Sequence, residues 1–510
     1  MDNYINIYEI ICRILNQKDL KLTPDTDFYE IGGDSMLAVE LIHYINSHFD
    51  TEISLGDFLE NTTPRNLLNL IKSNKSSLNY QENDEDNLNS KNIPLLPTQE
   101  ALMDFEDMVP KMHFNHLFDV LGIKGIIESE FLEKSINNVL KRHDALRASF
   151  NFKSRTQIIN EFKYLPLRIT EVKDMTELKK QVESDLHQPF NLESNAFFIR
   201  FHLICVNKSE YYLNIVAHHL IIDGYSLQML EKEIFMFYKA YLNAELPQID
   251  IDPPKYKSYV IKSLKNLPLT SAALVSQPIK FPQNIKEHIN QFQRKILIRE
   301  LNIEELKILQ NTPEMKGTTL FQILFSQFAL LLALKTKTNN FQVSLPILNR
   351  NSSVEIGTMG NISSVSTVNV VLDENTKLRD LIDDIGKQIK QTDIKFKWAT
   401  ERNYKENPNN SNVYFSYQKR FLFKDFKFEV QSENEKIFNN TYISPNGMKL
   451  MMNIDYNQNK IIFRLDYQMK YFDENYIYEL IRMYELLLSK FSTNINLTLN
   501  EIAEDIVNLN

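Results

Sequence analysis

Cysteine is scarce in this sequence: only Cys12 and Cys205 occur among the 510 residues. Two cysteines cannot supply a disulfide framework or a cysteine-ligated metal site, because both need more thiols at regular spacings. Each of the two lies inside an apolar stretch of the sequence. Free cysteine behaves as a small apolar side chain, so we expect two buried thiols without a chemical role.

Export and membrane signals are also missing. The first residues, MDNYINIYEI, have no basic region followed by a long apolar segment, which excludes a signal peptide of the usual kind. No apolar run is long enough to span a bilayer. The net charge of −9 argues against nucleic acid as a partner, since neutralising phosphates requires clustered Lys and Arg. We therefore expect a cytoplasmic protein with neither nucleic acid nor membrane as a partner.

The chain is too long for one ordinary hydrophobic core, so its length predicts two or three domains. The polar stretch 73–92, SNKSSLNYQENDEDNLNSKN, contains too few apolar residues to fold and predicts a flexible linker. A linker of this length spans about 25 Å. We expect a small domain over 1–72 and a large part after it, which a loose region divides into lobes at 93–270 and 271–510.

Apolar spacing predicts helices in the small domain and a mixture of helices and strands in the large part. A first helix has its apolar face at Ile7, Ile10, Ile11, Ile14 and Leu15, and a second begins at Ser35. A third is expected to begin near Thr63, with Pro64 at its first position. In the large part the patterns predict strands over 211–220, 340–348 and 460–468, and helices over 321–334 and 476–491.

The segment Gly32-Gly33-Asp34-Ser35 ends a loop and opens a helix. Glycines allow a tight turn that presents the serine hydroxyl, and the positive end of the helix dipole favours a phosphate there. A helix-capping serine without chemistry is the alternative for an isolated serine at this position.

The wider stretch DTDFYEIGGDSMLAVELIHYI resembles the segment around the modified serine of peptidyl and acyl carrier proteins. Residues 1–72 match that family in length, helix order and motif position. The resemblance implies a small all-α four-helix carrier domain. It also implies that a phosphopantetheinyl transferase attaches 4′-phosphopantetheine to Ser35, beside Asp34, and that the thiol of this group holds an acyl chain as a thioester.

A pair of histidines, His218 and His219, follows an apolar strand in the sequence HHLIIDG. A neutral imidazole accepts a proton near pH 7, and only one of two adjacent strand residues can face a given cavity. Asp223 could orient an imidazole or pair with an arginine, and Gly224 leaves room beside the backbone. A zinc site lacks a third ligand at a recognisable spacing, and a serine-hydrolase triad lacks its G-x-S-x-G turn.

In its context HHLIIDG resembles the HHxxxDG motif of nonribosomal peptide synthetase condensation domains, which have the fold of chloramphenicol acetyltransferase. Further motifs occur in the order of that family: IPLLPTQEALM, RHDALRASF, PFNLESNAFFIRFHLI, LPILNRNSSVEIGTMGNISS and RLDYQMKYFDENYI. The resemblance covers nearly all of residues 93–505. It implies an α/β condensation domain built from two acetyltransferase-like lobes.

The resemblance also implies a role for each motif residue. His219 matches the catalytic histidine, and His218 is expected to pack. Asp223 matches a structural acid that pairs with Arg350. Gly224 matches the glycine beside the tunnel for the pantetheine arm, and Asn361 matches the asparagine of the late motif.

Two positions depart from the pattern of the family: Met359 stands where an aromatic residue is usual, and Ile362 where a threonine is usual. The resemblance therefore does not define the shape of the tunnel or of the acceptor pocket. An epimerisation domain, which also has HHxxxDG, remains an alternative, although its glutamate-containing motif is missing. A scaffold that only docks carriers is the other alternative, whereas a heterocyclisation domain would have aspartates in place of the histidines.

The resemblance thus implies an acyltransferase that moves the acyl group from Ser35 to an amine and forms an amide bond. No metal and no nucleotide are implied. Because the sequence ends just past the last condensation motif, an adenylation domain or an upstream synthetase module is expected to act in trans, or the chain is a piece of a longer synthetase. The acceptor is expected to be a downstream carrier protein or a free amine.

Overall fold

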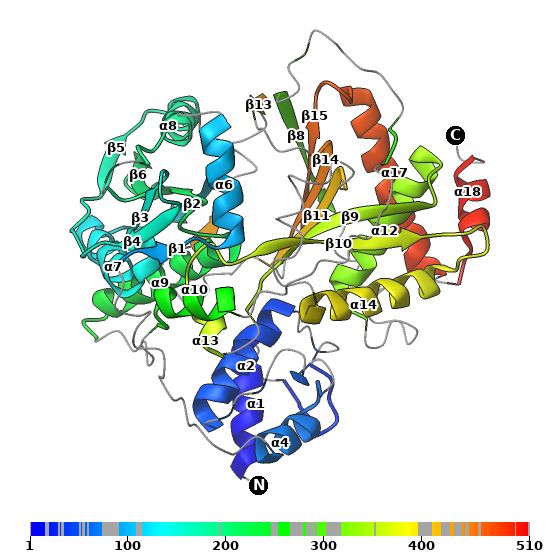
Figure 1. Ribbon diagram of the computed structural model, residues 1–510, viewed down its shortest axis with the longest axis horizontal. Coiled ribbons are helices and arrows are strands. Elements are labelled where there is room, and N and C mark those ends of the chain that lie inside the picture. Colours follow the sequence, from blue (N-terminus) through cyan, green and yellow to red (C-terminus); the bar gives the residue numbers. More distant parts are fainter. Residues whose placement is uncertain are drawn as a thin grey trace.

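The structure is a computed structural model of the whole chain, and Figure 1 shows its ribbon. It describes residues 2–15, 20–28, 31, 35–49, 51, 53, 57–58, 61–73, 91–108, 115–192, 194, 196–245, 253–265, 279–281, 289, 293–301, 318–350, 353–395, 411–419, 429–432, 441–443, 448–456, 461–494 and 496–507. Most of the predicted linker, residues 74–90, and the glycines Gly32 and Gly33 lie outside these ranges.

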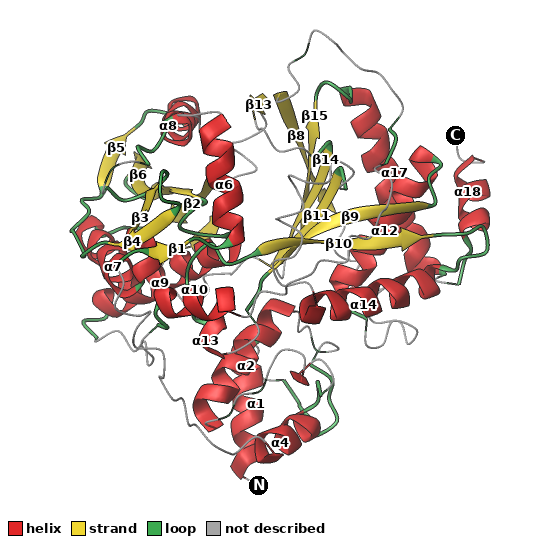
Figure 2. Cartoon of the chain, in the orientation of Figure 1, coloured by secondary structure: helices red, strands yellow, loops and turns green. Residues whose placement is uncertain are grey.

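The N-terminal domain is helical in its described part (Figure 2). Its helices are α1 (Asp2–Ile14), α2 (Ser35–Phe49) and α4 (Pro64–Ser73). Their apolar faces form a core in which Ile7, Leu41 and Leu67 are fully buried. Thr63 accepts a hydrogen bond from the backbone N–H of Asn66 and so caps α4, whose first residue is Pro64.

The first lobe of the large part contains a five-stranded sheet with the order β12-β2-β7-β6-β5. Its strands are β2 (His116–Lys124), β5 (Arg168–Glu171), β6 (Ile199–Asn207), β7 (Glu210–His218) and β12 (Glu429–Ser432). A small sheet adds β1 (Ile93–Pro94), β3 (Ala148–Asn151) and β4 (Thr156–Ile159). The helices are α6 (Pro97–Met108), α7 (Ser129–Arg142), α8 (Met175–His187), α9 (Gly224–Leu242) and α10 (Tyr256–Lys265).

The second lobe contains a seven-stranded sheet with the order β10-β9-β11-β14-β15-β8-β13. These strands are β8 (Gln293–Leu301), β9 (Asn340–Ile347), β10 (Ser364–Val371), β11 (Val413–Lys419), β13 (Thr441–Ile443), β14 (Leu450–Tyr456) and β15 (Ile461–Gln468). The helices are α12 (Leu320–Thr336), α13 (Ser353–Ile356), α14 (Leu378–Lys395), α17 (Glu474–Thr493) and α18 (Leu499–Val507). Each lobe has its own apolar core.

One strand crosses between the lobes. β12 comes from the second half of the sequence but pairs antiparallel with β2 at the edge of the sheet of the first lobe. Val430 is buried in the core of the first lobe, and the Ser432 hydroxyl donates a hydrogen bond to Asp119 at 2.6 Å. The lobes are therefore tied together by a ladder of backbone hydrogen bonds as well as by the continuous chain.

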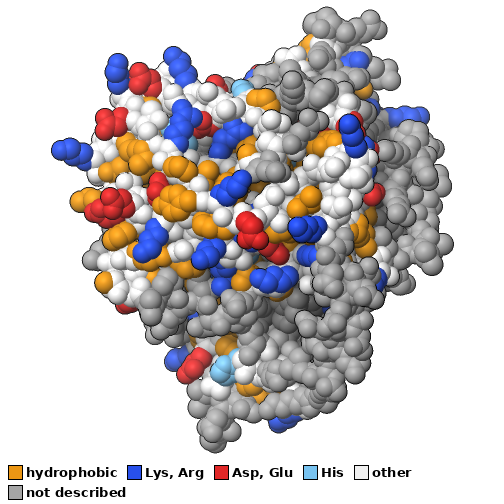
Figure 3. Space-filling view, turned by 60° about the vertical axis from the view of Figure 1, so that its left-hand side comes forward, with side chains coloured by type: hydrophobic (Ala, Val, Ile, Leu, Met, Phe, Trp, Pro, Cys, Tyr) orange, Lys and Arg blue, Asp and Glu red, His pale blue; other side chains and the backbone are white. Residues whose placement is uncertain are grey.

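The helices and strands expected from apolar spacing are all present. The strands predicted over 211–220, 340–348 and 460–468 correspond to β7, β9 and β15, and the helices over 321–334 and 476–491 to α12 and α17. The boundaries differ by one or two residues: α12 and α17 extend beyond the predicted ranges at both ends, whereas β7 ends at His218, two residues before the predicted limit. On the described part of the face in Figure 3, basic, acidic and apolar side chains are intermixed.

The two cysteines require a correction. Cys12 and Cys205 are both free thiols, but each is half-buried rather than fully buried. Cys205 stands near the end of β6, where the strand becomes partly exposed, and packs against the core of the first lobe, while Cys12 is a partly exposed residue of α1. Burial still raises the pKa of each thiol, which keeps both protonated at neutral pH.

Candidate functional site

The histidine motif occupies the connection between a buried strand and a helix. β7 ends at His218, and α9 begins at Gly224. The Asp223 carboxylate accepts a hydrogen bond from the backbone N–H of Ser226 at 2.8 Å, which caps α9. The loop therefore has a fixed end on each side, and His219 is its first residue.

His219 is half-buried and held by its backbone. Its N–H donates to the carbonyl of Asn115 at 2.7 Å. Among the described residues, no hydrogen-bond partner faces the buried Nδ1 of the ring. Burial lowers the pKa of His219 below its usual 6.5, and the charge of Asp223 opposes this effect only in part. The imidazole is consequently neutral at pH 7 and able to accept a proton.

The opening motif supports the histidine loop from the other side. The Gln99 side chain, which is buried, donates from Nε2 to the carbonyl of Leu220 at 2.8 Å. Its Oε1 accepts hydrogen bonds from the Leu96 N–H and from Gln157. Gln99 thus joins the start of α6 to the residue that follows His219.

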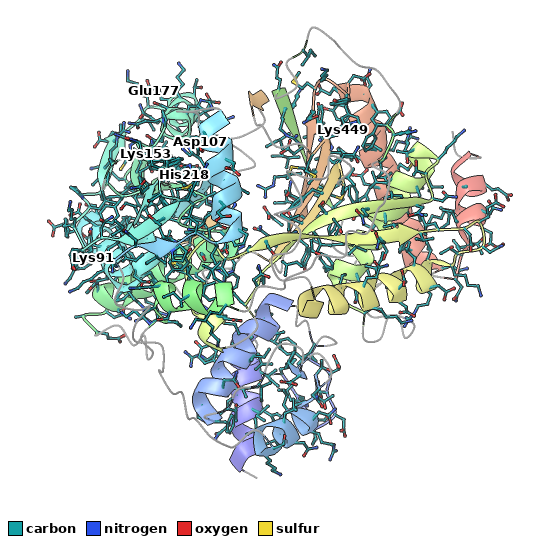
Figure 4. All side chains as sticks on the ribbon, in the orientation of Figure 1. Lys91, Asp107, Lys153, Glu177, His218 and Lys449 are labelled. Carbon is teal, nitrogen blue, oxygen red and sulfur yellow. The ribbon has the colours of Figure 1, made fainter. Side chains whose placement is uncertain are left out.

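His218 lies in the first lobe close to α6 (Figure 4) and has a defined tautomer. Its Nδ1 accepts a hydrogen bond from the Leu220 N–H, so the proton must be on Nε2, which donates to Glu106 at 3.1 Å. The same carboxylate oxygen accepts a hydrogen bond from Asn115 at 2.7 Å. Sequence reasoning missed Glu106, because a single glutamate on an amphipathic helix carries no motif of its own.

A buried ion pair fixes the end of the motif. Arg350 donates to both carboxylate oxygens of Asp223, at 2.9 and 3.1 Å, and both side chains are buried. Asp223 also accepts hydrogen bonds from the backbone N–H groups of Ile362 and Ser363. Burial alone would raise the pKa of Asp223, but the charge and hydrogen bonds of Arg350 outweigh it and lower the pKa to about 2. We refer to Asp223 and Arg350 as the clamp.

The late motif closes over the clamp at a glycine. Gly360 has a φ of 155°, and a Cβ atom built there would lie 2.5 Å from the ring of Tyr256. Its N–H and its carbonyl both bond the Ser226 hydroxyl at 3.0 Å, and Arg350 donates to that hydroxyl at 2.8 Å. Only glycine fits this position, which explains why a glycine stands between Met359 and Asn361 in the motif.

The remaining motif residues are also brought into this region. Gly224 faces the Gln418 side chain from β11, which would lie 3.1 Å from an added Cβ atom. Asn361 is buried, and its Nδ2 has no partner within the described chain. Met359 is buried in the core of the first lobe, and Ile362 in an apolar cluster that contains Tyr256. The two departures from the family pattern therefore fill apolar packing positions.

The serine motif is described through its helix. α2 begins at Ser35, so this serine stands at the N-terminus of a helix of 15 residues. The positive end of such a helix favours a phosphate group, and a serine hydroxyl is the chemistry that phosphopantetheine attachment requires. These features fit the group. Asp34 lies outside the described residues.

Neither a metal centre nor a membrane span is found in the described part of the chain. Within the described ranges, His, Cys, Asp and Glu side chains form no group of three or more that could hold a metal ion. No described helix combines the length and the apolar character needed to cross a membrane.

The structure thus combines a two-lobed domain, in which a histidine follows the end of a strand, with a helical domain that has a serine at the start of a helix, as expected of a carrier-linked acyltransferase. Residues 89–504 match the family model described as Condensation domain, and residues 6–71 match the one described as Phosphopantetheine attachment site. The chain belongs to the condensation-domain family found in nonribosomal peptide synthetases, and it carries an N-terminal domain that matches the phosphopantetheine attachment site of carrier proteins.

Relatives of known function are large synthetases. The chain is 22% identical over 510 residues to bacitracin synthase 1 of Bacillus licheniformis, with 94% of this chain and 9% of that protein covered. It is 22% identical over 512 residues to gramicidin S synthase 2 of Brevibacillus brevis, with coverage of 93% and 11%. The chain thus spans about a tenth of the length of these relatives.

A solved structure shows the same fold. The first condensation domain of the calcium-dependent antibiotic synthetase, in complex with a substrate analogue, aligns with a TM-score of 0.68 at 13% identity. The alignment covers 81% of this chain and 99% of that domain. The predicted fold class, a helical carrier domain before an α/β condensation domain of the chloramphenicol acetyltransferase type, is confirmed.

Proposed function

We propose that the condensation domain transfers an acyl group from Ser35 of its own carrier domain to an amine, with His219 as the catalytic residue. The observation that carries this proposal is the state of His219. A neutral imidazole is held at the end of β7 by the Asn115 carbonyl, by the Gln99 contact with Leu220 and by the clamp. Each of these contacts fixes the backbone of the loop that carries the ring, and burial keeps the ring unprotonated.

In this proposal each site residue has a separate role in the reaction. Ser35 holds 4′-phosphopantetheine, which supplies the thiol that bears the acyl group. His219 would accept a proton from the incoming amine as the amide C–N bond forms; the thioester C–S bond breaks, and the sulfur leaves as the free thiol after taking up a proton. Asp223, Arg350 and Gly360 fix the loop, and holding both reactants at one site supplies much of the rate through effective concentration.

The partners follow from the same scheme. A phosphopantetheinyl transferase modifies Ser35, and an adenylation domain or an upstream synthetase module supplies the acyl group. The acceptor is either a downstream carrier protein or a free amine. Residues 73–92 serve as the linker that lets the carrier domain move between these partners while it stays near its condensation domain.

Mass spectrometry of the intact protein tests the proposal. The chain is phosphopantetheinylated, loaded with an acyl group and mixed with candidate amines. We expect the acyl mass to be lost from the wild type, and the discharge rate to fall at least 100-fold in His219→Ala, since general-base catalysis contributes about 100-fold or more. His187→Ala replaces an exposed histidine and should react like the wild type.

The other outcomes identify the alternatives. Loss of an α-deuterium label from the acyl group without discharge would indicate epimerisation. Equal discharge by wild type and His219→Ala would show that the large domain acts only as a docking scaffold. Ser35→Ala should prevent the mass increase of phosphopantetheinylation altogether, and modification of this variant would place the attachment site elsewhere.

A further inference from the structure

The core of the carrier domain continues onto the condensation domain. Tyr225 and Ile356 belong to the same apolar cluster as Leu37, Leu41 and Ile42 of α2, and both are buried. Met229 and Leu348 pack around this cluster as partly buried residues. In Figure 1, α2 extends from the carrier domain to α13, near the junction of the two lobes. We call Tyr225, Met229, Leu348 and Ile356 the docking surface.

The docking surface lies directly beside the histidine motif. Tyr225 follows Gly224 in the first turn of α9, the helix that Asp223 caps. Ile356 ends α13, a short helix that follows Arg350 by a few residues. The carrier domain is therefore seated on the two segments that contribute the clamp, one from each lobe.

Tyr225 contacts both the carrier domain and the clamp. Its ring belongs to the carrier cluster, and the guanidinium carbon of Arg350 lies 4.6 Å from the centre of the same ring. A cation over an aromatic face is attracted to it, most strongly where water is excluded. Within the part of the chain that the structure describes, the buried Nε of Arg350 has no hydrogen-bond partner. The aromatic ring consequently supplies part of the environment that this buried cation needs.

Removal of the carrier domain would uncover this arrangement. Tyr225 is only 8% exposed and Ile356 only 3% exposed, so both would gain solvent contact if α2 moved away. Water near the ring would raise the local dielectric constant and weaken the attraction between Arg350 and its neighbours. The position of the motif loop is therefore sensitive to whether the carrier is seated.

We infer that docking of the carrier domain of this chain strengthens the Asp223–Arg350 clamp through the ring of Tyr225, so that the catalytic loop is best ordered when its carrier is in place. Tyr225 is then a positioning residue, because its ring contacts both the carrier domain and Arg350. Ile356 contacts the carrier domain but has no aromatic ring to place beside Arg350. The inference rests on the proposed function for its consequence in catalysis, but its structural part can be tested without any reaction.

Hydrogen–deuterium exchange of the unmodified full-length chain gives the first test. We expect Ile356→Ala and Tyr225→Ala to raise the exchange rate of the amides at 219–227 by about tenfold, which corresponds to about 1.4 kcal/mol of lost protection. Tyr225→Phe keeps the ring and should retain the protection of the wild type. Ile126→Ala alters a side chain that is 76% exposed in the first lobe and serves as the control.

Turnover with a soluble acyl thioester, which needs no docked carrier, gives the second test. We expect kcat to fall about tenfold in Tyr225→Ala and to recover in Tyr225→Phe, with KM nearly unchanged. If these variants exchange faster in α2 and α13 but not at 219–227, the carrier domain docks without affecting the catalytic loop, and the inference is overturned. A wild type that never discharges would refute the proposed function instead, while the exchange data would still decide the coupling.

Discussion

His219 is held in place by backbone contacts and not by a carboxylate. The two oxygens of Asp223 are taken up by Arg350, by Ser226 and by backbone N–H groups of the late motif, so its charge acts on the imidazole only from a distance. Burial is the larger influence and lowers the pKa of His219. The ring is thus a weak base that is fully available at neutral pH.

This state of His219 predicts the dependence of the reaction on pH. Protonation removes the lone pair, and the pKa is lowered below 6.5, so the discharge rate should be constant from pH 8 to about 6.5. Below the lowered pKa the rate should fall about tenfold per pH unit. Rapid-quench measurements of the acyl discharge rate at several pH values between 5 and 8 would define the dependence of this rate on pH. A fall that begins above pH 6.5 would contradict the lowered pKa, and His187→Ala should leave the curve in place.

Site residues differ in how far the sequence reveals them. The pairing of Asp223 with Arg350 is implied by the resemblance to the condensation-domain family, and in the structure the two side chains form a bidentate ion pair. Glu106 is separated from His218 by 112 residues and stands in no recognisable pattern, so only the three-dimensional contact identifies it. The roles of His219, Gly224 and Asn361 in the reaction stay predictions, although their positions are now defined.

At the scale of the element, helix α8 is fixed to the sheet of the first lobe by a buried polar network. Asp185 of α8 accepts hydrogen bonds from His202 at 2.6 Å and from Asn214 at 3.0 Å, and Arg168 contacts its other oxygen. His202 also contacts the Thr170 hydroxyl at 2.8 Å. These residues come from three neighbouring strands, so one carboxylate joins the helix to β5, β6 and β7.

Replacement of this carboxylate should destabilise the lobe in a way that depends on pH. Burial tends to raise the pKa of Asp185, but its bonds with His202, Asn214 and Arg168 outweigh that and lower it. A lowered pKa stabilises the fold above the ordinary aspartate pKa of about 3.9, and this stabilisation is lost as pH falls through the folded-state value. We expect Asp185→Asn to cost about 3 kcal/mol at pH 7, because it leaves buried partners unpaired.

Urea unfolding at pH 7 and at several lower values measures this difference. The gap between Asp185→Asn and the wild type should narrow as pH drops below about 4. Asp107→Asn changes a carboxylate whose side chain is 51% exposed and should have little effect at any pH. A gap that stays constant down to pH 3 would show that the charge of Asp185 is not what stabilises α8.

Elements with local signals were predictable and those with distant partners were not. α12 is buried on nearly all sides, because it lies between the sheet of the second lobe and other helices. Its apolar residues therefore show no one-sided pattern, and the length of the apolar run is what identifies it as a helix. β12 has only four residues and pairs with a strand some 300 positions earlier, as the 313-residue separation of Ser432 and Asp119 shows. No periodicity within such a short segment could have assigned it to the other lobe.

Among the described residues, the molecule has three large apolar cores and two smaller apolar clusters. The carrier domain and the two lobes each bury their own large cluster, and within the described ranges the carrier cluster contacts the lobes through the docking surface. Among the described residues, the clamp and the pairing of β12 with β2 are two of the connections between the lobes, and the late motif adds others, with Met359 in the core of the first lobe and Ile362 packed beside Tyr256. Each of these connections uses residues from both halves of the sequence, which a division at residue 270 does not anticipate.

Removal of both the clamp and the β12 pairing should weaken the coupling between the lobes enough for them to unfold separately. Arg350→Met leaves the Asp223 carboxylate buried without its cation, at a cost of about 3–5 kcal/mol. Val430→Asp places a charge in the core of the first lobe and should detach β12, since Val430 is only 5% exposed. Either change alone should lower the melting temperature and keep the lobes in one transition, because the remaining connections still couple them.

Calorimetry of the full-length chain distinguishes these cases. We expect the double variant to show two separate lobe transitions where each single variant shows one, since each lobe has a core of its own. Val371→Asp, at a strand position that is 64% exposed in the second lobe, is the matched control and should melt like the wild type. If the lobes of the double variant still melt together, contacts other than the clamp and β12 must couple them, and the route from the docked carrier to the catalytic loop would then have to include those contacts.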